Sequence, residues 1–353
     1  MATIRKRGNN YQGIVRRSGW PQQSASFPTK VKAERWCRAI ETKMDKGSFT
    51  DQSSAKKTTL SDLMVIYLNE VTALRRREQS RQVERYIIKR ILREEKALCG
   101  IALNKLKPAH FINYRDRRLL QCPKNQIATN DNPKTIAPST VNRELSVLKC
   151  IVDNRIRKFG LPFNPVNGRD VKRLAVNDER DLRLTHAEIQ RLLDAAYNMR
   201  NKLVGPFLEL LFETGARRGE LISLLWQDID ITKRTALFRD VKNTRDPNKI
   251  LNRSIGLSPR AITILKQLPR DSLRAFPMTA NAFKLSFQRA RNNANLKHFR
   301  THDARHERVS NLVEAGWPML QVMAQSGHND PKSLKRYTNL QANFLAEQLA
   351  RLG

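Results

Sequence analysis

The sequence predicts an α+β multidomain protein, in which a small three-stranded sheet with one helix precedes an all-α helical domain and a mainly helical domain with a β-hairpin. Three observations predict this class. The 353 residues exceed the usual size of a single domain. Two stretches of linker-like composition divide the chain. Strand and helix patterns occur in separate blocks, without the βαβ alternation that a parallel sheet requires.

Residues 1–48 form the first predicted domain. Short β-like runs at 3–7, 11–17 and 24–27 are separated by Gly-Asn-Asn and Gly-Trp-Pro turns, and a helical pattern follows from Thr29 to about Lys43. Eleven lysines and arginines stand against three acidic residues, so this domain is basic by itself. Residues 49–58 have no periodicity and are rich in serine and charge, which predicts a linker.

Residues 59–160 form the second predicted domain. Apolar residues recur at helical spacing in four stretches, which begin near Leu60, Val83, Phe111 and Val141. The fourth helix is expected to be capped by Ser139 after a proline. Residues 161–182 combine prolines, a glycine and mixed charge, and this composition predicts a second linker.

Residues 183–353 form the third predicted domain. Thr185 and Glu188 have the spacing of a capping box and predict a helix start, and a second helix at 203–213 should stop at Thr214-Gly215. A third helix is expected from about Arg217 through Leu225. The stretches 235–241 and 250–257 predict a hairpin, and helices fill the rest, with a stop at Gly327 and a new start at residue 331.

The balance of charge predicts a polyanionic partner. Lys and Arg number 66 against 33 Asp and Glu, which gives a net charge of +33 and an isoelectric point of about 10.7. An anionic membrane is the competing partner, but the longest apolar stretch, 203–212, contains Pro206 and Glu209 and is about half the length of a spanning helix. The first 20 residues show no secretory pattern. We therefore expect no membrane partner and a cytoplasmic, nucleoid-associated protein.

The sequence offers no motif for a metal or a nucleotide cofactor. Cys37, Cys99, Cys122 and Cys150 are isolated, without the C-x-x-C spacing of zinc or redox sites. The phosphate-binding, dinucleotide-binding and H-E-x-x-H patterns do not occur. The expectation is therefore a protein that needs neither a cofactor nor a metal.

Candidate catalytic residues gather in the third domain. Arg217 follows the break at Gly215, at a helix start that suits an anion, and Glu220 shares its face and could orient the guanidinium. His302 and Arg305, in T-H-D-A-R-H, also share one helix face. Each of these signals alone has an ordinary interpretation, such as a solvated arginine or a surface ion pair.

Three further candidates complete the set. Lys242 lies at the exit of the first hairpin strand, and His328 follows Gly327 in a turn. Tyr337 lies about two turns into the next predicted helix. Lys335 and Arg336 flank it, so the phenol would lie among cations that face a polyanion; the alternative is a core tyrosine beside Leu334.

In this order the six residues resemble the signature of the tyrosine recombinase (phage integrase) family. T-G-A-R-R-G-E around Arg217 is similar to the first arginine box, H-D-A-R-H to the His-x-x-Arg box, and S-G-H and K-R-Y-T supply His328 and Tyr337. The resemblance extends over residues 183–345. Lys242 corresponds to the hairpin lysine, but it stands in V-K-N-T before a long turn, so Lys249 remains an alternative.

The resemblance also covers the first two domains. Residues 59–160 are similar to the core-site DNA-binding domain of the family. Residues 1–48 are similar to the arm-type DNA-binding module of some integrases. The DNA-binding candidates of this module are its basic strand residues, Arg5, Lys6, Arg7, Arg16 and Arg17.

The resemblance implies a reaction and its partners. Tyr337 would attack the scissile phosphate to give a 3′-phosphotyrosyl intermediate, Arg217 and Arg305, helped by His328, would hold the phosphoryl oxygens, and Lys242 would protonate the leaving 5′ oxygen. His302 would accept the phenol proton. The implied partners are double-stranded DNA recombination sites, three further protomers in a homotetramer, and an accessory DNA-bending or directionality factor. A C-terminal helix near 342–352 would dock on a neighbouring protomer.

The expected function is therefore site-specific DNA recombination. The residues do not separate integration, excision and inversion of DNA segments, although the chain also resembles shufflon-type DNA invertases. Two alternatives remain: a type IB topoisomerase-like activity, which shares the chemistry, and a non-catalytic sequence-specific DNA-binding protein with a degenerate recombinase fold. Charge alone does not separate DNA from RNA.

Overall fold

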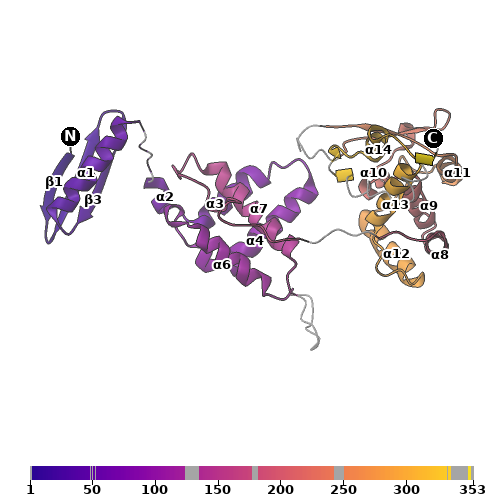
Figure 1. Ribbon diagram of the computed structural model, residues 1–353, viewed down its shortest axis with the longest axis horizontal. Coiled ribbons are helices and arrows are strands. Elements are labelled where there is room, and N and C mark those ends of the chain that lie inside the picture. Colours follow the sequence, from indigo (N-terminus) through magenta and orange to yellow (C-terminus); the bar gives the residue numbers. More distant parts are fainter. Residues whose placement is uncertain are drawn as a thin grey trace. The chain divides into compact units, whose positions relative to one another are not determined.

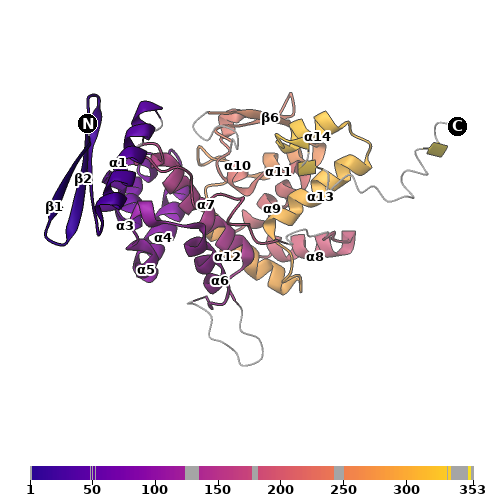
Figure 2. The same cartoon turned by 60° about the vertical axis from the view of Figure 1, so that its left-hand side comes forward.

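The computed structural model describes residues 2–47, 49, 51, 53–123, 135–176, 182–241, 250–331, 333–334 and 349–350 (Figures 1 and 2). The chain divides into two compact units, Met1–Asp178 and Glu179–Gly353. The predicted fold class is confirmed: a three-stranded sheet with a helix, a helical domain, and a mainly helical domain with a small sheet.

The N-terminal sheet is antiparallel, with strand order β1-β2-β3. Its strands are β1 (Ala2–Arg7), β2 (Asn10–Arg17) and β3 (Trp20–Phe27). The turns contain Gly8 and Gly19 at positive φ, which suits tight hairpins. Helix α1 (Lys30–Asp45) starts at Thr29, whose hydroxyl accepts from the Lys32 amide, and it packs on β2. The approach is close, because a Cβ at Gly13 would stand 2.8 Å from the Cys37 sulfur.

The helical domain begins with capped, amphipathic helices. Thr59 and Asp62 form a capping box at the start of α3, and the apolar faces of α3, α4, α6 and α7 meet in one core. Helix α7 starts with Pro138 at its first position, so Ala137 takes the cap position that we expected at Ser139. The elements are α2 (Ser53–Lys57), α3 (Leu60–Tyr67), a π-turn (Leu68–Thr72), α4 (Glu78–Glu94), α5 (Lys96–Cys99), a 3-10 turn (Leu103–Lys105), α6 (Pro108–Leu119) and α7 (Pro138–Arg155).

Residues 161–176 pack onto the helical domain, although their composition predicts a linker. Val166 and Val171 are fully buried in its core. Asn164 donates to the carbonyl oxygen of Lys149 at 3.0 Å, and Asn142 donates to that of Leu174 at 2.9 Å. Two asparagine side chains thus bond the irregular segment to α7, and composition alone cannot distinguish such a segment from a solvated linker.

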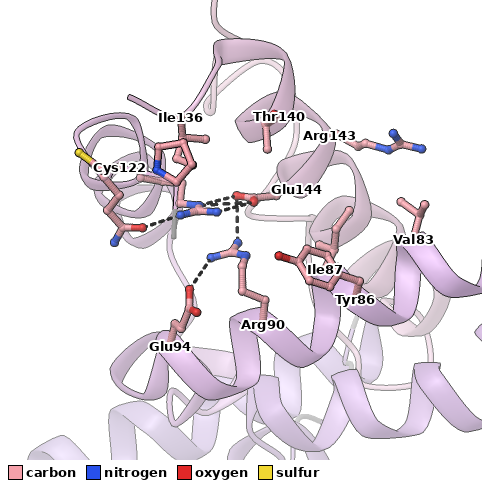
Figure 3. Close-up of a pocket in the computed structure, with 13 residues that line it drawn as sticks. Val83, Tyr86, Ile87, Arg90, Glu94, Cys122, Ile136, Thr140, Arg143 and Glu144 are labelled. Atoms are coloured by element: carbon pink, nitrogen blue, oxygen red, sulfur yellow. Dashed lines mark hydrogen bonds and ion pairs between the residues drawn. The ribbon is translucent and has the colours of Figure 1, made fainter. Parts of the chain in front are cut away.

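The helical domain also contains a pocket of about 690 Å³ above a buried polar cluster (Figure 3). The Tyr114 hydroxyl donates to Glu144 at 2.7 Å and accepts from Arg90 at 2.6 Å, while Arg118 donates to Glu144 at 3.2 Å. These side chains come from α4, α6 and α7 and contact one another in the interior of the domain. None of the catalytic candidates from the sequence lines this pocket.

The second unit is built around α9, which contacts α8, α10, α11, α12 and α13. Helix α9 carries Phe207, Leu208 and Leu211 into the main core. The small sheet has the order β4-β5-β6. The elements are α8 (His186–Tyr197), α9 (Val204–Thr214), α10 (Arg218–Ile222), a 3-10 turn (Trp226–Asp228), β4 (Ile229–Asp230), β5 (Thr235–Phe238), β6 (Arg253–Gly256), α11 (Pro259–Gln267), α12 (Ala280–Asn293), α13 (Thr301–Glu314) and α14 (Met319–Ser326).

Two local expectations in this unit are corrected. Helix α10 ends at Ile222, so Leu224 and Leu225 do not extend its apolar face as the sequence suggested. The hairpin gains a third strand, β4, whose two residues pair with β5. Within the described part of the chain, no helix has both the length and the apolar character to cross a membrane.

Candidate active site

Two glycine turns place the catalytic candidates of the second unit. Helix α9 ends at Gly215, whose φ of 64° is left-handed, and the chain turns so that Arg217 precedes α10. Helix α14 ends in the same way at Gly327, with φ of 72°, and His328 follows. Both helix ends agree with the sequence prediction. In both turns a catalytic candidate, Arg217 or His328, follows the glycine and lies outside the preceding helix.

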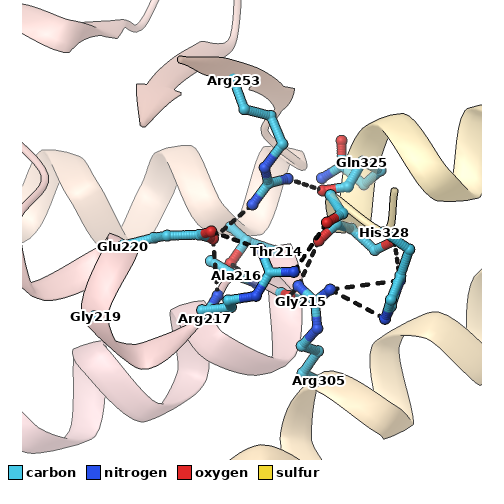
Figure 4. A network of polar contacts seen from close by, with 12 residues as sticks. Thr214, Gly215, Ala216, Arg217, Gly219, Glu220, Arg253, Arg305, Gln325 and His328 are labelled. Carbon is cyan, nitrogen blue, oxygen red and sulfur yellow. Dashed lines mark hydrogen bonds and ion pairs between the residues drawn. The ribbon is translucent and has the colours of Figure 1, made fainter. Parts of the chain in front are cut away.

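Arg305 lies on α13 and connects these two turns (Figure 4). Arg305 is buried, with only 2% of its surface exposed. The Nη1 group donates to the carbonyl oxygen of Gly215 at 2.8 Å and also to that of Ser326. The Nη2 group lies 3.2 Å from Nε2 of His328. A buried guanidinium therefore holds the ends of α9 and α14 together.

Arg217 also connects the two turns, since it follows the first and contacts the second. Its Nη1 group donates to Glu220 at 2.8 Å, and its Nη2 group donates to the carbonyl oxygen of Gly327 at 2.9 Å. The backbone N–H of Arg217 donates to the second Glu220 oxygen at 3.0 Å. The Arg217 side chain is 32% exposed, so this guanidinium is the more accessible of the two.

Glu220 has a second arginine partner that the sequence reasoning did not select. Arg253, the first residue of β6, donates from Nη2 to Glu220 at 2.6 Å and from Nη1 to the carbonyl oxygen of Gln325. Burial raises the pKa of Glu220, but the charges of Arg253 and Arg217 outweigh it and hold the pKa below its ordinary value. In β6, Arg253 and the buried Ile255 are two residues apart and therefore share the inward face of the strand. This spacing is the sequence signal that could have identified Arg253.

Both candidate histidines are neutral near pH 7. Burial is the main cause that lowers the pKa of His302 to about 4, with further contributions from His306 and Arg305. Burial, Arg305 and Arg217 lower the pKa of His328 to about 3. A neutral imidazole at His302 has a lone pair that can take a proton, as the sequence hypothesis requires.

The hydrogen bonds of His328 define its tautomer. The Ser326 hydroxyl donates to the carbonyl oxygen of Val322 at 2.6 Å and lies 2.7 Å from Nδ1 of His328. With that hydroxyl donating to Val322, we assign the proton of this contact to Nδ1. Nε2 is then an acceptor directed at Arg305. His328 thus orients the Arg305 guanidinium.

The structure brings together Arg217, Glu220, Arg305 and His328, with His302 one helical turn before Arg305. Lys242, Lys249, Lys335, Arg336 and Tyr337 lie outside the described residues, as does most of 342–352. Leu334, three residues before Tyr337 in the sequence, is fully buried with Val309, Leu312 and Val322 of α13 and α14. The basic residues Arg5, Lys6, Arg7, Arg16 and Arg17 are exposed on β1 and β2 of the first unit.

Comparison with known proteins agrees with this site. Residues 182–343 match the phage integrase family. A Haemophilus influenzae protein with the provisional name integrase/recombinase is 29% identical over 94% of this chain and 85% of its own length. The shufflon-specific DNA recombinase of Escherichia coli is 29% identical over 83% of this chain and 72% of its own length. The fold is similar to that of the Tn1549 transposon integrase in complex with a circular intermediate DNA, with a TM-score of 0.66 and 17% identity over 84% of this chain and 100% of that one.

The site and these similarities define a DNA strand-transfer enzyme. Over residues 182–343 the chain belongs to the tyrosine recombinase, or phage integrase, family. It is therefore a site-specific recombinase or integrase, as the sequence motifs predicted.

Proposed function

We propose that the chain cleaves and rejoins DNA through a 3′-phosphotyrosyl link to Tyr337, with Arg217 and Arg305 as the clamp on the scissile phosphate. The observation that carries this proposal is the convergence of the two guanidiniums on the turn at Gly327 and His328. Guanidinium forks match the oxygens of a phosphate and stabilise the charge that develops on them.

The proposed steps balance without an external energy source. The Tyr337 oxygen forms a bond to phosphorus, and the bond from phosphorus to the 5′ oxygen breaks. Neutral His302 takes the phenol proton, and Lys242 gives a proton to the departing 5′ oxygen. The phosphotyrosyl ester conserves the bond energy, so the 5′ hydroxyl of a second strand reverses the step and releases Tyr337.

Arg217 is partly exposed and Arg305 is buried, and this difference supports different roles for the two arginines in binding the phosphate. Arg217 has a side chain that a phosphate can approach from solvent. Arg305 uses one edge of its guanidinium on two carbonyl oxygens and is oriented by His328. Glu220 holds Arg217 in place through a 2.8 Å contact. We assign Arg217 the larger share of direct contact and Arg305 a pre-organised position behind it.

We also propose a role for each domain. Residues 1–48 act as an arm-type DNA-binding module, 59–160 act as the core-site-binding domain, and 183–353 carry out catalysis. The linkers predicted at 49–58 and 161–182 are in part packed on the helical domain, through Ala55 of α2 and through residues 161–176. The exposed basic residues on β1 and β2 support the first assignment. Removal of residues 1–50 should leave cleavage of a minimal core site intact and weaken binding to accessory sequences. Loss of cleavage in the folded, truncated protein would contradict the arm assignment.

The proposed assembly is a homotetramer on two double-stranded DNA sites, in the cytoplasm, with the segment near 342–352 docked on a neighbour. An accessory DNA-bending or directionality factor completes the partners we propose. The family resemblance supports both statements. Cross-linking on paired sites, followed by denaturing electrophoresis, should give a four-protomer species that unpaired sites do not give.

Covalent capture tests the function itself. The native protein is incubated, with chelator present, with a random library of nicked duplexes from which the 5′ fragment can diffuse away. We expect protein–DNA adducts that resist denaturant, and their sequences should converge on one core site. An absence of adducts from both this library and the DNA that flanks the gene would contradict the recombinase proposal.

A further inference from the structure

Arg253 occupies a central place among the catalytic candidates without itself facing solvent. Its side chain is 11% exposed, and its guanidinium lies 5.2 Å from the centre of the buried Phe238 ring. It contacts Glu220 of α10 and the carbonyl oxygen of Gln325 at the end of α14 (Figure 4). One side chain thus joins the sheet to α10 and to the end of α14, where Ser326 and Gly327 accept from the two clamp arginines.

The end of α14 is fixed to β6 by a second set of contacts. The Gln325 side chain accepts from the Gly256 amide at 3.0 Å and donates to the Gly256 carbonyl oxygen at 3.0 Å. The Arg253 side chain also fills the space beside Gly327, where an added Cβ would stand 2.6 Å from Arg253 Nε. The next carbonyl oxygens after Gln325, those of Ser326 and Gly327, are the acceptors for Arg305 and Arg217.

The charge balance depends on Arg253 as well. Glu220 is buried and negative, and it contacts both Arg217 and Arg253. If Arg217 were its only partner, a planar carboxylate would favour a two-pronged contact with that one guanidinium. Such a contact would compete with the Gly327 carbonyl and with a phosphate for the Arg217 N–H groups. Arg253 donates to the second Glu220 oxygen beside the Arg217 backbone N–H, and two guanidiniums around one carboxylate leave a net positive cluster.

We propose that Arg253 is a positioning residue for the recombinase reaction, which acts through Glu220 and the end of α14 to hold Arg217 in the orientation that a phosphate requires. This inference rests on the proposed function. It assigns no direct contact between Arg253 and DNA, since its guanidinium is enclosed by Glu220, Phe238 and Gln325.

The test compares Arg253→Leu, Arg253→Lys and Glu220→Gln with the double variant that combines Arg253→Leu and Glu220→Gln. The matched control is Arg260→Leu, because Arg260 also pairs with a buried glutamate, Glu209, at 2.7 Å, but away from the site. Each protein is measured for the single-turnover rate of adduct formation on the captured core duplex, for affinity to that duplex, and for melting temperature.

Arg253→Leu should slow adduct formation by about 10- to 100-fold, the range expected when a catalytic group is displaced by about 1 Å. Its affinity for the duplex should stay within about threefold, because the interaction that is lost acts in the transition state. Arg260→Leu should leave the cleavage rate unchanged and lower the melting temperature less than Arg253→Leu, because the Arg260 side chain is 55% exposed and that of Arg253 is 11% exposed. Arg253→Lys should retain part of the rate, since an ammonium restores the charge without the fork.

The double variant shows whether Arg253 acts through Glu220. In the Glu220→Gln background, Arg253→Leu should cost a smaller factor in rate than in the native background, because the uncompensated carboxylate is gone. Equal factors in the two backgrounds would overturn the proposed route, and a native rate in folded Arg253→Leu would overturn the role itself. If Arg253→Leu does not fold, a native rate in Arg253→Lys overturns it. Failure of the native protein to form adducts would instead count against the proposed function.

Discussion

Arg217 donates to the carbonyl oxygen of Gly327 at 2.9 Å, across 110 residues of sequence. The preceding carbonyl oxygen, that of Ser326, accepts from Arg305. Two consecutive peptide groups at the end of α14 therefore orient both arginines of the proposed clamp. A disturbance of this one turn should reach both guanidiniums together.

Alanine at Gly327 tests this dependence. Gly316→Ala is the matched control, because both glycines have left-handed φ, 72° and 79°, but only Gly327 has a side chain close to its missing Cβ. The left-handed backbone should cost each variant about 1–2 kcal/mol in the free energy of unfolding. Gly327→Ala should lose more, and it alone should slow adduct formation, since Arg253 must move. Equal losses of stability and equal cleavage rates would count against a turn that positions the arginines.

Tyr337→Phe separates the proposed nucleophile from DNA binding. The substitution removes one oxygen and retains the ring, so affinity for the core duplex should stay within a few-fold of native while covalent capture disappears. Protease digestion of the native adduct should leave the DNA label on the peptide that contains Tyr337. An adduct that persists in Tyr337→Phe would assign the nucleophile to another residue.

The choice between Lys242 and Lys249 can be made by chemical rescue. A substrate with sulfur at the 5′ bridging position releases a thiolate that needs no proton, so it should restore cleavage by Lys242→Ala. Arg217→Ala and Arg305→Ala should stay slow on the same substrate, because they lose charge stabilisation rather than an acid. Rescue of Lys249→Ala in place of Lys242→Ala would reverse the assignment.

The buried histidines predict an acid-sensitive catalytic domain. The pKa values of His302 and His328, about 4 and about 3, lie below the unperturbed value of 6.5. Between these folded-state values and pH 6.5, the unfolded chain therefore binds more protons than the folded chain. Their contribution to stability is complete above about pH 6.5 and is lost as the pH falls toward the folded-state values. Denaturant titrations of residues 183–353 should show this fall, and His328→Gln should flatten it. An equal slope in both proteins would contradict a neutral, buried His328.

Several features could be predicted from the sequence because they depend on near neighbours. Thr185 and Glu188 form the expected capping box, with the Thr185 amide 2.8 Å from the Glu188 carboxylate. Gly215 and Gly327 end their helices in the left-handed conformation that glycine favours. The family signature is local in the same sense, since each box spans only a few residues.

Tertiary structure alone decided the features that depend on distant partners. The strand β4 exists because Ile229 and Asp230 pair with β5. Residues 161–176 are held on the helical domain because Asn142 of α7 donates to the Leu174 carbonyl oxygen and Asn164 donates to that of Lys149 in α7. Arg253 is one of 66 lysines and arginines in the sequence, and only its contacts with Glu220 and Gln325 in the folded chain distinguish it from the others. The low pKa values of His302 and His328 arise from burial and from arginines that folding brings near. Periodicity and caps report the local backbone, whereas the charge and solvation of a site are set by groups that are far apart in the chain.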